Sequence, residues 1–130
     1  MKTAIKHMNA DQIRSEIDAI ERKRQSIRVE QDDLFDRSAR FEVERRKLTE
    51  QLSEIGKRLF EIAKSTTTDR GEVEDLFSQN THLTDKIEGI MSAERMVYRE
   101  IDANFARDAA LDRREKLVMN RSRELQSQAA

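Results

Sequence analysis

Apolar residues recur along this chain in alternating steps of four and three residues, and this repeat constrains the fold more than any other feature. In the first half, one position of every seven-residue repeat from Ile13 to Ile62 holds Ile, Leu or Phe. A second series runs from Val73 to Leu125, and its corresponding position is apolar except at Asn104. Because this spacing lets a helix bury one seam against another, the repeat predicts two long helices that form a coiled coil.

The composition agrees with a shared seam better than with a large compact core. Charged residues make up 39% of the 130 residues, hydrophobic residues make up 36%, and proline is absent. This charge density is also typical of disordered chains. The regular apolar spacing distinguishes the two cases and favours folded helices, since a seam between two helices needs few apolar residues. We therefore expect an all-α fold.

The expected boundaries follow from capping residues and from one interruption of the helix-favouring composition. Asn9 with Gln12 and Asp69 with Glu72 have the spacing of capping pairs. Hydroxyl and β-branched residues precede the second pair and favour a turn. We expect one architectural unit with five parts: a frayed N-terminus at 1–8, a helix over 9–64, a turn at 65–70, a second helix over 71–127 and a tail at 128–130.

A short turn between two long helices predicts an antiparallel coiled-coil hairpin, with further self-association left open. If residues whose numbers add to 135 are paired, Gln31 lies opposite Asn104, and each core arginine lies beside core carboxylates. A parallel homodimer would instead place like charges against each other, which is costly in a desolvated seam. The polar residues at core positions that support this register are Arg24, Gln31, Arg45, Glu94, Asn104, Asp108 and Glu115.

The second helix carries an additional apolar edge next to its seam. Five large residues share one heptad position there: Phe77, Met91, Tyr98, Phe105 and Met119. They could widen the seam between the two helices. They could also form a docking face for a second copy or for another protein, as in helix-in-groove recognition. We take these five as the candidate partner-binding residues.

No motif in the sequence indicates catalysis, a cofactor or a metal. Cysteine is absent, and no glycine-rich phosphate-binding pattern occurs. His82, Asp85 and Glu88 share one side of a helix, but three ligands on one helix rarely complete a coordination sphere. We therefore expect no enzyme activity, no bound cofactor and no metal site.

The charge balance disfavours nucleic-acid binding. Lys and Arg total 25 against 26 Asp and Glu, and the basic clusters are interleaved with acidic residues. No apolar run reaches the roughly 20 residues of a membrane span. These features predict a cytoplasmic protein without membrane partners.

The sequence therefore predicts a non-enzymatic coiled-coil module that acts as a scaffold, stalk or adaptor for a protein partner of unknown identity, or as a homodimer. The layout is similar to helical hairpins that serve as stalks in export machinery or as chaperone arms, although no specific motif supports that similarity. The alternatives are an export stalk or chaperone of the secretion-apparatus type, and a small regulatory inhibitor that a phage could encode. A nucleic-acid-associated coiled coil is a less favoured alternative, and an enzyme is the least favoured. The excess of Arg over Lys is compatible with a bacterial or phage protein.

Overall fold

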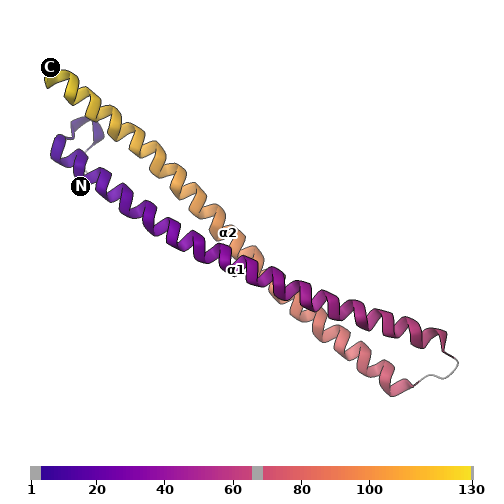
Figure 1. Cartoon of the computed structure of the whole chain (residues 1–130). Coiled ribbons are helices and arrows are strands. Elements are labelled where there is room, and N and C mark those ends of the chain that lie inside the picture. Colours follow the sequence, from indigo (N-terminus) through magenta and orange to yellow (C-terminus); the bar gives the residue numbers. More distant parts are fainter. Residues whose placement is uncertain (1–3, 66–68, 130) are drawn as a thin grey trace. The chain divides into compact units, whose positions relative to one another are not determined.

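The computed structural model describes residues 4–65 and 69–129. The chain forms a short 3-10 helix, η1 (Ile5–His7), and two long α-helices, α1 (Ala10–Lys64) and α2 (Arg70–Ala129). The two long helices pack against each other as a hairpin (Figure 1). The predicted all-α hairpin is therefore confirmed.

A reciprocal pair of hydrogen bonds fixes the start of α1. The backbone N–H of Asn9 donates to Oε1 of Gln12, and the backbone N–H of Gln12 donates to Oδ1 of Asn9, both at 2.9 Å. This capping box satisfies two donors that the first helical turn would otherwise leave unpaired. The predicted capping role of Asn9 and Gln12 is confirmed.

The segment before α1 differs from the frayed N-terminus expected for residues 1–8. Ile5–His7 forms η1, and Met8 is buried. The side chain of Arg121, near the end of α2, donates from Nε to the carbonyl oxygen of Met8 at 3.1 Å. The apolar side chain of Met8 and its backbone acceptor thus hold this segment against α2, while residues 1–3 lie outside the described part of the chain.

The start of α2 uses its capping pair in a different way. Asp69 Oδ1 accepts a hydrogen bond from the backbone N–H of Glu72 at 3.2 Å. The Glu72 side chain contacts the other helix instead, where Nε of Arg58 on α1 donates to Glu72 Oε1 at 2.6 Å. Residues 66–68 of the turn expected at 65–70 lie outside the described residues. The second helix begins at Arg70 and continues to Ala129, so it includes part of the expected tail.

The chain divides into two compact units, and each contains a segment of both helices. The terminal unit comprises Met1–Leu34 and Glu100–Ala130. Within it, η1 and the start of α1 lie beside the end of α2 (Figure 1). Its apolar cluster combines residues from both chain segments: Met8, Ile13 and Val118, with Ile5, Ile17 and Leu125 packed around them.

The connection unit comprises Phe35–Arg99 and includes the residues between the two helices. Its core is a larger apolar cluster made by α1 and α2 together. The buried members are Leu48, Ile55, Leu83 and Ile90, and the partly buried members are Phe41, Leu52, Leu59, Leu76 and Ile87. All nine belong to the two heptad series, so the seam predicted from the sequence forms the core of this unit.

Candidate protein-binding surface

Three of the five predicted edge residues lie on α2 in the connection unit. Phe77, Met91 and Tyr98 have exposed fractions of 57%, 46% and 49%. The core cluster beside them is filled by other side chains of the heptad series. Each of the three therefore presents a large apolar surface to solvent, and its role in binding a partner remains a prediction.

The other two edge residues lie on α2 in the terminal unit. Phe105 is 57% exposed and Met119 is 41% exposed. The neighbouring seam residue Val118 is fully enclosed, so the edge and the seam are distinct surfaces of the same helix turn. The sequence left open whether the edge residues fold over the seam, and in both units about half of each side chain faces solvent.

Several other large apolar side chains are also exposed, although they are not among the five predicted edge residues. They lie outside the two seam series and are not confined to one heptad position: Val29, Phe35, Val43, Phe60, Met96 and Leu117. The ammonium group of Lys64 lies over the ring of Phe60, with its Nζ 4.3 Å from the ring centroid. The signal that could have identified this set is an apolar residue away from the seam, since such a residue has no partner in a two-helix hairpin.

Gln31 and Asn104 form a buried polar layer in the terminal unit. Asn104 is fully buried, and its Nδ2 donates to Oε1 of Gln31 at 3.2 Å. Gln31 Nε2 in turn donates to the backbone carbonyl of Ile101 at 3.3 Å, and Nη1 of Arg107 donates to Asn104 Oδ1 at 2.6 Å. Within the described residues, no buried side-chain nitrogen or oxygen lacks a hydrogen-bond partner. This layer is therefore buried without leaving its polar atoms unsatisfied.

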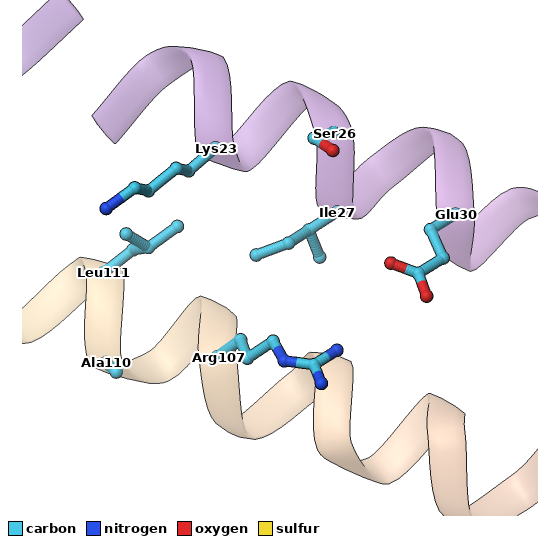
Figure 2. Close-up of a pocket in the computed structure, with 7 residues that line it drawn as sticks. All are labelled: Lys23, Ser26, Ile27, Glu30, Arg107, Ala110 and Leu111. Carbon is cyan, nitrogen blue, oxygen red and sulfur yellow. The ribbon is translucent and has the colours of Figure 1, made fainter. Parts of the chain in front are cut away.

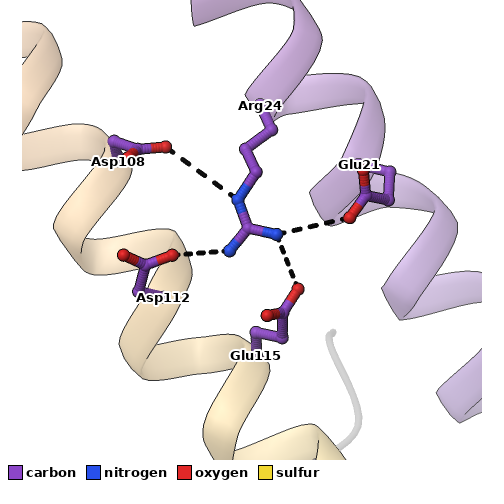
Figure 3. Close-up of polar contacts among 5 residues, drawn as sticks. All are labelled: Glu21, Arg24, Asp108, Asp112 and Glu115. Atoms are coloured by element: carbon purple, nitrogen blue, oxygen red, sulfur yellow. Dashed lines mark hydrogen bonds and ion pairs between the residues drawn. The ribbon is translucent and has the colours of Figure 1, made fainter.

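Arg24 lies at the centre of an acidic cluster in the terminal unit (Figure 3). Its Nη1 and Nη2 donate to Glu115 and Asp112, both at 2.6 Å. Glu21 on its own helix and Asp108 on α2 lie 3.3 Å and 3.9 Å from its nitrogens. The hydrogen bonds to Glu115 and then Asp112 raise the pKa of the Arg24 guanidinium above its ordinary value, although burial opposes the rise. The structure thus brings together Arg24, Asp108 and Glu115.

Arg45 and Glu94 form the corresponding pair in the connection unit. Glu94 is buried, and its two oxygens accept hydrogen bonds from Nε and Nη2 of Arg45 at 2.8 Å and 3.5 Å. The hydrogen bond to Glu94 is the main cause of a raised pKa of Arg45. A buried carboxylate is tolerated here because the guanidinium compensates its charge and occupies its acceptors.

Two interhelical ion pairs were not found by sequence reasoning. Arg114 pairs with Glu16 in the terminal unit, and Arg58 pairs with Glu72 in the connection unit. All four residues lie at heptad positions next to the seam, and these positions can be read from the sequence alone. The hydrogen bond to Glu72 raises the pKa of Arg58.

An open groove in the terminal unit has a mixed apolar and charged lining (Figure 2). Its volume is about 440 Å³. Ile27 and Leu111 lie along it, with Lys23 and Glu30 flanking Ile27 on α1 and Arg107 on α2. Arg107 is already engaged with Asn104. Ser26 and Ala110 complete the lining.

The described residues contain no group of three or more His, Asp or Glu side chains arranged to hold a metal ion. Within the same residues, neither long helix has an apolar stretch of the length and character needed to cross a bilayer. Comparisons with protein-family models, with curated proteins and with solved structures found no match to this chain. Function must therefore be argued from the surface itself.

Proposed function

We propose that this chain is a non-enzymatic protein-interaction module of the cytoplasm, which uses its two-helix hairpin as a scaffold, stalk or adaptor. The partner is a protein that packs an apolar face against the edge of α2. The observation that supports this proposal is the exposure of Phe77, Met91 and Tyr98, each about half open to solvent beside a core that is already complete without them.

The spacing of these residues suits a helical partner. Residues seven apart lie two turns apart on nearly the same side of a helix, about 10 Å along its axis. Phe77, Met91 and Tyr98 thus offer anchors at intervals that an amphipathic helix can match with its own apolar residues. Large aromatic and Met side chains are enriched in the anchoring positions of protein interfaces.

Affinity capture with a matched pair of variants tests the proposal. The full chain is immobilised and exposed to nuclease-treated lysate of the native organism, and bound proteins are quantified by mass spectrometry. Met91→Asp combined with Tyr98→Asp places charges on the edge. Met96→Asp is the control, because Met96 lies on the same helix, is 63% exposed and is outside the edge.

We expect a defined set of proteins to bind the wild type and the Met96→Asp chain and to be depleted roughly tenfold from the double variant. Circular dichroism should show equal helicity for all three chains, because every substituted side chain is exposed. Equal capture by the double variant and the wild type would rule out this edge as the docking face. Capture is repeated with lysate that has not been treated with nuclease, and proteins that bind only in that lysate would instead indicate a nucleic-acid-mediated association.

A further inference from the structure

The open groove of the terminal unit lies where the apolar seam is interrupted. Ile27 is only partly buried, whereas Ile20 and Leu34, one heptad before and after it, are 2% and 1% exposed. Asp108 faces Ile27 in the heptad register, but its Oδ1 lies 3.9 Å from Nε of Arg24. The seam therefore lacks an apolar partner at Ile27, and the groove opens beside this residue.

The charges around the groove lie on one flank of the seam, which we call the groove flank. Arg114 pairs with Glu16 across this flank, and the corresponding flank of the connection unit pairs Arg58 with Glu72. In both ion pairs the residue numbers add to 130, so this spacing identifies the flank positions that face each other. The groove flank consists of Glu16, Lys23 and Glu30 on α1 and of Glu100, Arg107 and Arg114 on α2.

Two neighbouring positions of the groove flank hold like charges. Lys23 faces Arg107, and Glu30 faces Glu100. All four side chains are exposed, and none of them makes an ion pair with another described residue. Arg107 instead donates to Asn104 Oδ1 on its own helix at 2.6 Å, and Figure 2 shows its guanidinium turned away from Lys23. A basic position is thus followed, one heptad further along α1, by an acidic one.

This charge pattern is less favourable than one that the same positions allow. Lys23→Glu would place a carboxylate opposite Arg107, and Glu30→Lys would place an ammonium group opposite Glu100. Each change would permit an ion pair of the kind that Arg114 makes with Glu16. Local arrangements that forgo available stability are expected at functional surfaces. Here the unpaired charges flank an apolar gap.

A helix with an acid, a large apolar residue and a base on one face is complementary to this groove. Lys23 and Glu30 lie at opposite ends of the groove, with Ile27 between them (Figure 2). An acid and a base seven residues apart on another helix have the same separation, about 10 Å. An apolar residue between them reaches the floor made by Ile27 and Leu111. A small amphiphile would stay largely in water in so open a groove, whereas a helix covers its length.

We propose that this groove binds an amphipathic helix of another protein. The partner helix places an acid near Lys23, an apolar side chain against Ile27 and a base near Glu30. The proposal goes beyond the function proposed above, because the groove flank and the edge that carries Phe105 and Met119 lie on opposite sides of the seam.

A peptide titration followed by nuclear magnetic resonance tests the site directly. The probe is a stapled alanine-based helical peptide in which Leu follows a Glu by four residues and a Lys follows the Leu by three. Amide shifts of the full chain should centre on Lys23, Ile27 and Leu111. We expect a dissociation constant of about 0.1–1 mM, since the contact is one apolar side chain and two exposed ion pairs. Replacing the Leu of the peptide by Ala should weaken binding roughly tenfold.

Charge variants of the chain distinguish binding from a purely structural role. Lys23→Glu and Glu30→Lys should each weaken the probe about threefold or more. Each should also raise the urea midpoint of the chain, because it completes an ion pair within the hairpin. Lys116→Glu is the control, since Lys116 is exposed on α2 and lies outside the groove. The probe carries no net charge, so general charge attraction cannot produce these differences.

The remaining outcomes would overturn the proposal. Absence of shifts at the groove with about 5 mM peptide would exclude helix binding there, and so would an affinity that both charge variants leave unchanged. Octanoate, which combines an apolar chain with one carboxylate, is the second probe. Octanoate binding as tight as that of the peptide at the same residues would assign the groove to a small amphiphile. Shifts at Phe105 and Met119 in place of the groove would refute this inference and leave the proposed function standing.

Discussion

The terminal unit and the connection unit are built from the same two helices, yet their interiors differ in kind. The connection unit has a continuous apolar cluster and one buried ion pair, Arg45 with Glu94. The terminal unit has a smaller apolar cluster together with the Gln31–Asn104 layer and the carboxylates around Arg24. The terminal unit also buries apolar residues outside its cluster, namely Ile20, Leu34, Ile101 and Leu111, so its polar groups interrupt an apolar seam rather than replace it.

The difference shows that a heptad seam can be closed by two kinds of contact. Apolar contacts are not directional, so they tolerate many alignments of two helices with similar energy. A buried amide pair is directional, because a shift of one helix past the other separates donor from acceptor and leaves both unsatisfied. In coiled coils, a single buried polar residue of this kind can fix the register at some cost in stability. We therefore assign register selection to the terminal unit, where the buried amide pair lies, whereas apolar contacts stabilise both units.

The largest expected effects come from removing one isoleucine side chain in each unit. Ile20 of the terminal unit is 2% exposed and Ile90 of the connection unit is 9% exposed. Truncation to alanine should lower the free energy of unfolding by about 2–5 kcal/mol in each case, with the larger loss for Ile20→Ala because its surroundings enclose it more fully. Urea denaturation followed by circular dichroism measures both. Losses under about 1 kcal/mol at both sites would contradict a packed seam.

An intermediate effect is expected from the buried amide layer. Asn104→Leu leaves Oε1 of Gln31 without the donor it now uses, which should cost about 1–3 kcal/mol of unfolding free energy. Gln31→Leu combined with Asn104→Leu removes both partners and should recover most of that loss. The measurement is a double-mutant cycle in urea.

The same double variant tests register selection. Without the amide pair, alternative alignments of the two helices should become populated in the terminal unit, and distances between spin labels on α1 and α2 there should broaden. A double variant as unstable as the sum of the two single variants would show that the layer does not act as a pair. An unchanged distance distribution would place register selection elsewhere.

The smallest expected effect is a difference between Arg24 and Arg45 variants in how their stability depends on pH. Because the pKa of Arg24 is raised above the ordinary arginine value, its stabilising contribution is complete below that ordinary value and is lost only at higher pH, so it is constant between pH 7 and 11. Arg24→Lys introduces a group with an ordinary pKa of about 10.4, whose contribution is lost as the pH rises through its folded-state value. The stability difference between wild type and variant should therefore grow from pH 7 to pH 11.

Arg45→Lys is the matched variant in the connection unit. Arg45 contacts one carboxylate, Glu94, whereas Arg24 lies within 4 Å of four carboxylates, so the growth with pH should be smaller for Arg45→Lys. Urea midpoints at pH 7, 9 and 11 provide the comparison. A difference between wild type and Arg24→Lys that is constant with pH would show that the charge at this position does not stabilise the unit.

The fold was predictable because the information for it repeats along the whole chain. In each helix the same four-and-three spacing of apolar residues extends over about fifty positions. The side chains of Asn9 and Gln12 also indicate a helix start, because they can form a capping box. The N-terminal segment was not predictable in this way. Its attachment uses the carbonyl oxygen of Met8, and a backbone acceptor leaves no trace in the residue pattern.

The sequence predicted where the candidate surface lies, but not whether its side chains are exposed to solvent. Heptad position identified Met91 and Tyr98 as neighbours of the seam. Whether such side chains fold over the seam or face solvent depends on rotamers and on the size of the opposing side chains, which spacing does not encode. The flanking pair of Arg114 and Glu16 was missed for a related reason, since a highly charged chain offers many opposite-sign neighbours and only geometry selects among them.

The division into units also determines the order in which the protein can fold during its synthesis. The connection unit is continuous in sequence, so all of its contacts become available once residue 99 has left the ribosome. Residues 4–34 are made before the connection unit but must wait for residues 100–129, which supply the carboxylates of Asp108, Asp112 and Glu115 around Arg24. The segment made before the connection unit is thus buried after that unit, so its apolar residues stay exposed to aggregation for longer.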